Sequence, residues 1–175
     1  MASPPLPVYV EIEKGSNIKY EFDKATQSLQ VDRVLDTATG YPFAYGFFPN
    51  TLADDGDELD VLIVRKQNDI RNDRVYPAHI IGALVMEDEK GMDEKVLCVL
   101  TDDYAQVQDI GDLDTKTKDQ IDEFFSTYKL KSPGRWSKTY GFLNHQQAIQ
   151  LYGKSLPPER SPLAASLPER KKSIV

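Results

Sequence analysis

The fold is decided by residues 8–35, which read VYVEIEKGSNIKYEFDKATQSLQVDRVL. Apolar side chains recur at every second position in residues 8–12 and again in 18–22, which is the period of a strand with one apolar and one polar face. Turn residues then lead to a third alternating run over 29–35, in which Arg33 shares the apolar face. We therefore expect three consecutive strands at the start of the fold.

Three further strands are predicted downstream. Residues 61–64 are apolar without interruption, which is typical of a strand buried on both faces, and two longer runs cover 75–86 and 96–101. No helical segment alternates with these strands. We therefore predict an α+β, mainly β fold, built as a small, closed or nearly closed, antiparallel OB-like barrel.

The last third of the chain carries a helical pattern. Apolar side chains from Ile121 to Tyr128 recur at i, i+3, i+4 and i+7, which predicts an amphipathic helix over 114–130 with its N-cap at 114 or 115. A second short helix is expected over 144–152, ended by Gly153. Two helices would then flank the barrel, the first being a candidate subunit contact.

The composition changes near residue 154. Residues 1–153 read as a single domain, whereas 154–175 form a basic, proline-rich tail, a composition typical of extended or disordered chain. Docking of the tail on the acidic body or on a neighbouring subunit is the alternative.

Charge and cysteine content narrow the class of protein. The 175 residues include 21 Lys and Arg against 28 Asp and Glu, so the net charge of −7 argues against broad contact with nucleic acid or an anionic membrane. No apolar run approaches the roughly 18 residues of a membrane span. The lone cysteine, Cys98, lies among apolar neighbours, which indicates a buried thiol without a disulfide. The N-terminus lacks the pattern of a secretory leader, so we expect a cytoplasmic protein.

Acidic residues crowd into the stretch 54–60, DDGDELD. Two like charges about 4 Å apart repel by roughly 4 kcal/mol at an effective dielectric of 20, so converging carboxylates spread into water, become protonated or hold cations. An acidic surface turn is one reading of this stretch. In the other, Asp55 and Asp57 share a face and Asp60 enters the next strand, and such oxygen ligands suit Mg²⁺ or Mn²⁺. A second acidic patch at 87–95 reads by itself as a polar hairpin loop.

The order of these motifs resembles the soluble family I inorganic pyrophosphatases of prokaryotic type. The resemblance runs from about residue 8 to about 140, and its motifs are IKYE at 18–21, YPxxYG at 41–46, DGDxxDV at 55–61 and FFxxYK at 124–129. The chain departs from the family pattern at Glu58, where proline is common, and at Ala44, where asparagine is common.

The resemblance implies Mg²⁺-dependent hydrolysis of inorganic pyrophosphate to two orthophosphates by a metal-activated water. It makes Asp57 the general base. The implied ligands of several Mg²⁺ ions, with Mn²⁺ as a possible substitute, are Asp55, Asp60, Asp88, Asp93 and Glu21. The implied contacts to the phosphoryl groups are Lys19, Arg33, Tyr45, Lys95, Tyr128 and Lys129. Glu11 and Tyr41 would support the cavity.

The same resemblance implies a homo-oligomer, a hexamer in short-chain members of the family. A barrel that binds divalent metal without turnover is the main rival, but chelation alone needs neither Asp57 nor Lys19 and Arg33. A barrel that binds oligonucleotides is the second rival, and the charge of −7 speaks against it.

Overall fold

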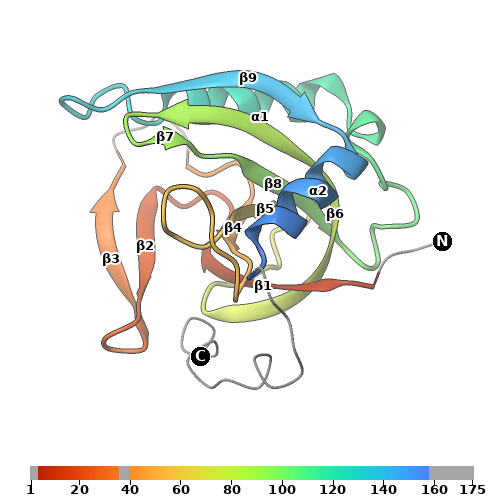
Figure 1. Ribbon diagram of the computed structural model, residues 1–175, viewed down its shortest axis with the longest axis horizontal. Coiled ribbons are helices and arrows are strands. Elements are labelled where there is room, and N and C mark those ends of the chain that lie inside the picture. The colour runs from red at the N-terminus through yellow and green to blue at the C-terminus, as the bar shows by residue number, and fades with distance from the viewer. Residues whose placement is uncertain (1–3, 36–39, 158–175) are drawn as a thin grey trace.

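The computed structural model describes residues 4–35 and 40–157 (Figure 1). Its strands are β1 (Leu6–Ile12), β2 (Ile18–Asp23), β3 (Ser28–Val34), β4 (Ala44–Phe47), β5 (Asp60–Ile63), β6 (Arg74–Asp88), β7 (Gly91–Met92), β8 (Lys95–Leu100) and β9 (Ser137–Leu143). Its helices are α1 (Thr115–Thr127), α2 (His145–Ser155) and the short 3₁₀ turn η1 (Ile110–Asp112). The mainly β class with two flanking helices is confirmed.

Five strands close into a barrel in the order β1-β4-β5-β8-β6, with β6 pairing back onto β1. The first part of the long strand β6 pairs with β1, and its later part pairs with β8, β7 and β9. The pairing of β5 with β8 is parallel, which the antiparallel prediction did not include. Strands β4, β7 and β9 were also not predicted. Gly46 allows β4 to pair closely with β1. A Cβ atom at this position would lie 1.8 Å from the carbonyl oxygen of Tyr9, so only glycine fits there.

The barrel strands are buried on both faces. One core cluster includes Leu62 of β5 and the apolar face of α1, and the other includes Val61 and Ile63 together with Ala148 of α2. This explains the unbroken apolar run of β5. The predicted polar face of β1 is wrong, because every side chain from Val8 to Ile12 is buried.

Both predicted helices are present with adjusted ends. The side chain of Asp114 accepts a hydrogen bond from the Thr117 amide at 2.7 Å and is the N-cap of α1. Helix α2 continues through Gly153 to Ser155, so residues 154 and 155 are helical rather than part of a tail. The predicted tail from residue 158 onward lies outside the described residues. Within the described ranges, no helix is both long enough and apolar enough to cross a membrane.

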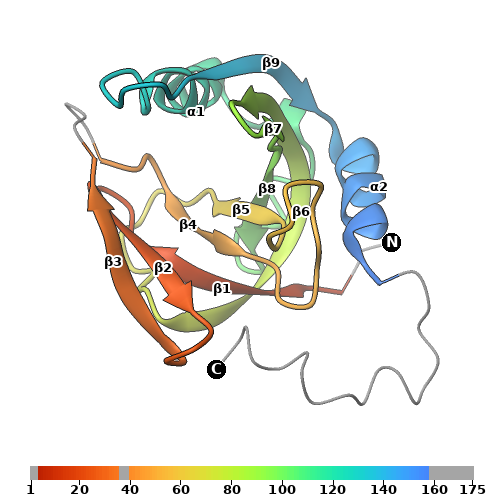
Figure 2. The same ribbon diagram turned by 60° about the vertical axis from the view of Figure 1, so that its left-hand side comes forward.

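Strands β2 and β3 form a separate two-stranded hairpin beside the barrel (Figure 2). Lys19 pairs with Arg33 and Tyr20 with Val31, so Asp32 is an extra residue in β3. Because of this bulge, the prediction that Arg33 shares the apolar face of residues 29–35 is wrong. A bulge shifts the alternation by one residue, so Arg33 lies on the face of Lys19, while Val31 lies on the opposite face and is 59% exposed.

Candidate active site

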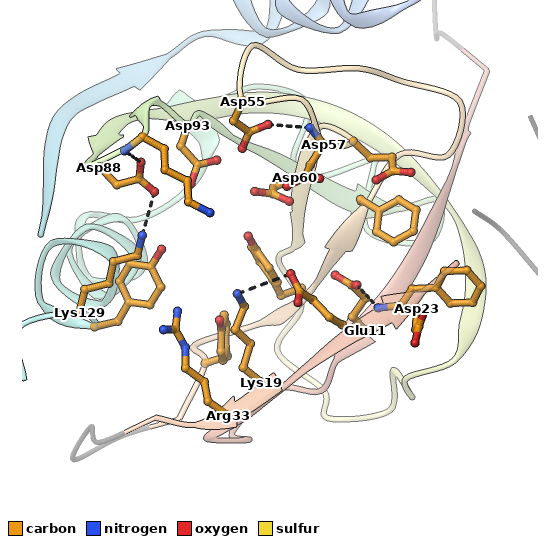
Figure 3. A pocket seen from close by; sticks show the side chains of 18 of the residues that line it. Glu11, Lys19, Asp23, Arg33, Asp55, Asp57, Asp60, Asp88, Asp93 and Lys129 are labelled. Atoms are coloured by element: carbon orange, nitrogen blue, oxygen red, sulfur yellow. Dashed lines mark hydrogen bonds and ion pairs between the residues drawn. The ribbon is translucent and has the colours of Figure 1, made fainter. Parts of the chain in front are cut away.

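A cavity of about 410 Å³ opens between the β2–β3 hairpin and the rim of the barrel (Figure 3). Every side chain that the sequence assigned to a site lines this cavity, apart from Lys95, which lies buried beneath it. The lining residues from the prediction are Glu11, Lys19, Glu21, Arg33, Tyr41, Tyr45, Asp55, Asp57, Asp60, Asp88, Asp93, Tyr128 and Lys129. The structure therefore brings together residues that lie up to 118 positions apart in the chain.

The loop 53–59 holds its carboxylates by hydrogen bonds within itself. The amide of Asp57 donates to Oδ1 of Asp55 at 3.0 Å, and the amide of Ala53 donates to the carbonyl of Asp57 at 2.7 Å. Gly56 makes the turn with φ of 90°, a conformation that other residues rarely adopt. Partial burial raises the pKa of Asp55 above its ordinary value. The loop thus fixes two carboxylates on the cavity side.

The parallel pairing of β5 with β8 places Asp60 beside Lys95 at the start of both strands. The Lys95 side chain is 2% exposed, and its Nζ atom donates to Oδ2 of Asp60 at 2.7 Å, to Oδ2 of Asp93 at 2.9 Å and to the hydroxyl of Tyr45 at 2.9 Å. Burial works against the charged form of Lys95, but Asp60 and its neighbours hold the pKa of Lys95 well above its ordinary value. The floor of the cavity is therefore an ammonium group held between two carboxyl groups.

These two carboxyl groups differ in their affinity for protons. Burial raises the pKa of Asp60 to about 7, although Lys95 lowers it and Asp93 adds to the rise. Burial also opposes the ionisation of Asp93, yet the ammonium of Lys95 brings the pKa of Asp93 below its ordinary value. Asp93 is therefore the more readily ionised of the two.

The β6–β7 hairpin and the end of α1 form a second charged contact. Lys129 follows the helix, is 5% exposed and donates to Oδ2 of Asp88 at 2.8 Å. Glu89, which the sequence did not single out, lies 3.5 Å from Lys129 Nζ and 3.3 Å from Arg135 Nε and accepts from the Trp136 amide at 3.2 Å. The sequence feature that could have pointed to Glu89 is its position within the acidic patch 87–95.

The hairpin supplies the cations of the opposite wall. Figure 3 shows Lys19 and Arg33 pointing into the cavity across from Asp55, Asp60 and Asp93. Lys19 Nζ and Arg33 Nε lie 3.3 Å and 3.8 Å from one carboxylate oxygen of Asp32. Among the described residues, the buried Arg33 Nε has no partner within hydrogen-bond distance. Ammonium and guanidinium groups on a cavity wall can bind an anion there.

Uncharged donors and one carboxyl group complete the lining. Burial raises the pKa values of Tyr45 and Tyr128, so both hydroxyls stay protonated near neutral pH. Glu11 is 8% exposed and accepts a hydrogen bond from the Phe22 amide at 2.9 Å. Burial raises the pKa of Glu11 to about 8, with the Phe22 amide acting in the opposite direction.

The cavity also includes charged residues that the sequence did not assign to the site. They are Asp23, Lys24, Glu58, Lys90 and Arg135. Sequence signals existed for some of them, because Glu58 lies inside the acidic stretch and Arg135 follows the last motif of the resemblance. The turn residues Asp23 and Lys24 carried no such signal, since only the folded hairpin brings them to the cavity.

The donor set fits hard divalent cations. Within the described ranges, no three Asp, Glu, His or Cys side chains converge closely enough to hold an ion without other ligands. Mg²⁺ is commonly held by one or two carboxylates together with waters and substrate phosphates, so oxygen donors spread around a cavity suit it. The Lys95 ammonium between Asp60 and Asp93 demonstrates that this part of the cavity favours positive charge.

The fold and the cavity together define a class: small strand barrels with a cavity at the rim that is lined by cationic side chains and carboxylates. A family model described as inorganic pyrophosphatase matches residues 8–157. The chain belongs to this family.

Individual relatives agree with this membership. The inorganic pyrophosphatase of Helicobacter pylori strain J99 is 46% identical over 155 residues, which cover 85% of this chain and 88% of the relative. The inorganic pyrophosphatase of Sulfolobus acidocaldarius is 44% identical over 156 residues, covering 82% and 87% of the two chains. A solved inorganic pyrophosphatase from Helicobacter pylori superposes with a TM-score of 0.84 at 45% identity, covering 87% of this chain and 91% of that one. One from Thermus thermophilus superposes with a TM-score of 0.81 at 37% identity, covering 86% and 88%.

Proposed function

We propose that this chain is a Mg²⁺-dependent inorganic pyrophosphatase that cleaves pyrophosphate with water to give two orthophosphates. The observation that carries the proposal is the opposition of two walls in one cavity, with the cationic side chains of the hairpin on one side and carboxylates on the other. A chelating site needs only carboxylates. The guanidinium and ammonium groups opposite them match a substrate that is itself an anion.

The phosphoryl groups are bound by the cations and hydroxyls of the chain. Lys19 and Arg33 approach them from the hairpin, and Lys129 and Tyr128 approach from the end of α1. Lys95 and Tyr45 act from the cavity floor, where Lys95 offsets negative charge without contact to bulk water. Cationic donors fixed in a partly dry cavity stabilise charge that develops on phosphoryl oxygens.

Asp55, Asp60, Asp88, Asp93 and Glu21 are the proposed holders of Mg²⁺, several ions per site, with Mn²⁺ as a possible substitute. When bound, these ions supply neutralisation of the substrate's charge and acidification of water. Glu11 and Tyr41 support the cavity from within, because both are buried against its inner side.

Asp57 is the proposed general base. It lies on the loop 53–59 next to Asp55 and faces the cavity (Figure 3). The oxygen of the attacking water forms the new bond to one phosphorus, the bridging P–O bond breaks, and Asp57 takes the proton of the water. A positioned base of this kind contributes about 10²–10⁴ in rate.

We also propose that the enzyme works in the cytoplasm as a homo-oligomer, a hexamer by family resemblance. The net charge of −7 supports a role without nucleic acid or an anionic membrane surface. The apolar face of α1 packs on the chain's own core, so a subunit contact through this helix uses its polar face. Light scattering coupled to size exclusion measures the oligomer directly.

The test is phosphate release from pyrophosphate with Mg²⁺, without it and in Asp57→Asn. We expect release that depends on the metal and that falls at least tenfold in the variant. Asn keeps the size and hydrogen-bonding shape of Asp57, so a loss without a change in melting temperature points to proton transfer. Metal-independent release, or an unchanged rate in Asp57→Asn, contradicts the proposal. Asp69→Asn, exposed and outside the cavity lining, is the matched control.

A further inference from the structure

One ion pair joins the turn of the β2–β3 hairpin to the acidic loop 53–59. The Nζ atom of Lys24 lies 2.9 Å from Oε2 of Glu58, and both residues line the cavity. The Glu58 side chain is only 14% exposed, whereas that of Lys24 is 59% exposed. Lys24 therefore reaches from an open turn to a carboxylate that is packed against the protein.

The hairpin has few other attachments near this turn. Its nearest hydrogen bond to the barrel is the one that the Phe22 amide donates to Glu11, and the Phe22 ring packs on Tyr9 at 5.4 Å. Among the described residues, the side-chain hydrogen bonds of residues 24–28 stay inside the turn or reach the adjoining strand residues of the hairpin. The Lys24–Glu58 ion pair thus links the end of the hairpin to the loop 53–59 of the barrel.

The two segments that the pair joins carry opposite halves of the site. The hairpin carries Lys19 and Arg33, and the loop carries Asp55 and Asp57. A small anion has to contact both walls at once, so the separation of the walls decides whether a phosphoryl group held by the cations also faces the carboxylates.

We propose that Lys24 and Glu58 are positioning residues that fix the separation of the two cavity walls for substrate binding, an inference that rests on the proposed function. Neither residue is assigned a contact with substrate.

The kinetic test uses Lys24→Met, Glu58→Gln and the charge swap Lys24→Glu with Glu58→Lys. Because the pair is partly exposed, we expect each single variant to raise KM for pyrophosphate about two- to fivefold while kcat stays within about twofold. The charge swap restores KM, since it rebuilds the pair with its polarity reversed. Lys154→Met, exposed on α2 and outside the cavity lining, is the control and leaves both constants unchanged.

Hydrogen exchange provides a readout that does not need turnover. In the protein without substrate, we expect the amides of residues 22–28 to exchange faster in Lys24→Met and to recover in the charge swap. Unchanged exchange and unchanged KM in the single variants overturn the proposal, and so does a charge swap that fails to restore either measurement. If the wild type releases no phosphate, the proposed function fails, while the exchange experiment still decides whether the pair holds the hairpin.

Discussion

Replacement of Glu11 by glutamine is expected to change how the stability of the metal-free protein depends on pH. Glu11 is 8% exposed, and burial raises its pKa to about 8 from an ordinary value of 4.5. The folded protein therefore binds this proton more tightly than the unfolded chain does. The contribution of this proton to the free energy of unfolding is complete below pH 4.5 and is lost as the pH rises through 8.

The structure sets the size of this effect. The rise in the pKa of Glu11 from 4.5 to about 8 corresponds to about 5 kcal/mol in the free energy of unfolding, at 1.36 kcal/mol per pKa unit. A domain is commonly stable by about 5–15 kcal/mol, so ionisation of Glu11 is a large fraction of the total. Glutamine cannot ionise, and its side-chain oxygen can still accept the hydrogen bond of the Phe22 amide.

The assay is urea unfolding in the presence of a chelator, at several pH values between 5 and 8.5 and at one protomer concentration. We expect the stability of Glu11→Gln relative to the wild type to grow by several kcal/mol from pH 5 to pH 8. Glu21→Gln is the control, because that carboxylate lines the same cavity but its side chain is 60% exposed. A stability difference between Glu11→Gln and the wild type that stays constant over this pH range refutes the reasoning.

Other substitutions test the barrel and its floor. Gly46→Ala places a Cβ atom against backbone, so we expect a loss of more than about 3 kcal/mol or no soluble protein. Gly153→Ala, inside α2 with open space around it, should gain about 0.5–1 kcal/mol, and thermal melts of both glycine variants measure these changes. Lys95→Met leaves Asp60 and Asp93 without their ammonium, and we expect a loss of about 3–5 kcal/mol in chelator, partly recovered with Mg²⁺. Absence of that recovery would speak against a cation position there.

The sequence by itself determined the strand-rich class, both helices and most of the residues in the cavity. Period-two alternation and the i, i+3, i+4, i+7 pattern are local, so they show along the chain which segments are strands and which are helices. The crowding of DDGDELD likewise showed that residues 54–60 need cations or water. The motif order then indicated which distant residues belong to one site.

Only the tertiary structure decided how these residues meet. The parallel register of β5 and β8 puts Lys95 between Asp60 and Asp93, and the bulge at Asp32 turns Arg33 to the cavity. Neither feature has a local signature, because strand direction and register depend on which strands close the ring. The ion pairs between distant parts of the chain, such as Lys24 with Glu58, form only after the barrel closes. The energy of such a pair depends on the distance between the charges in space, and the fold sets that distance.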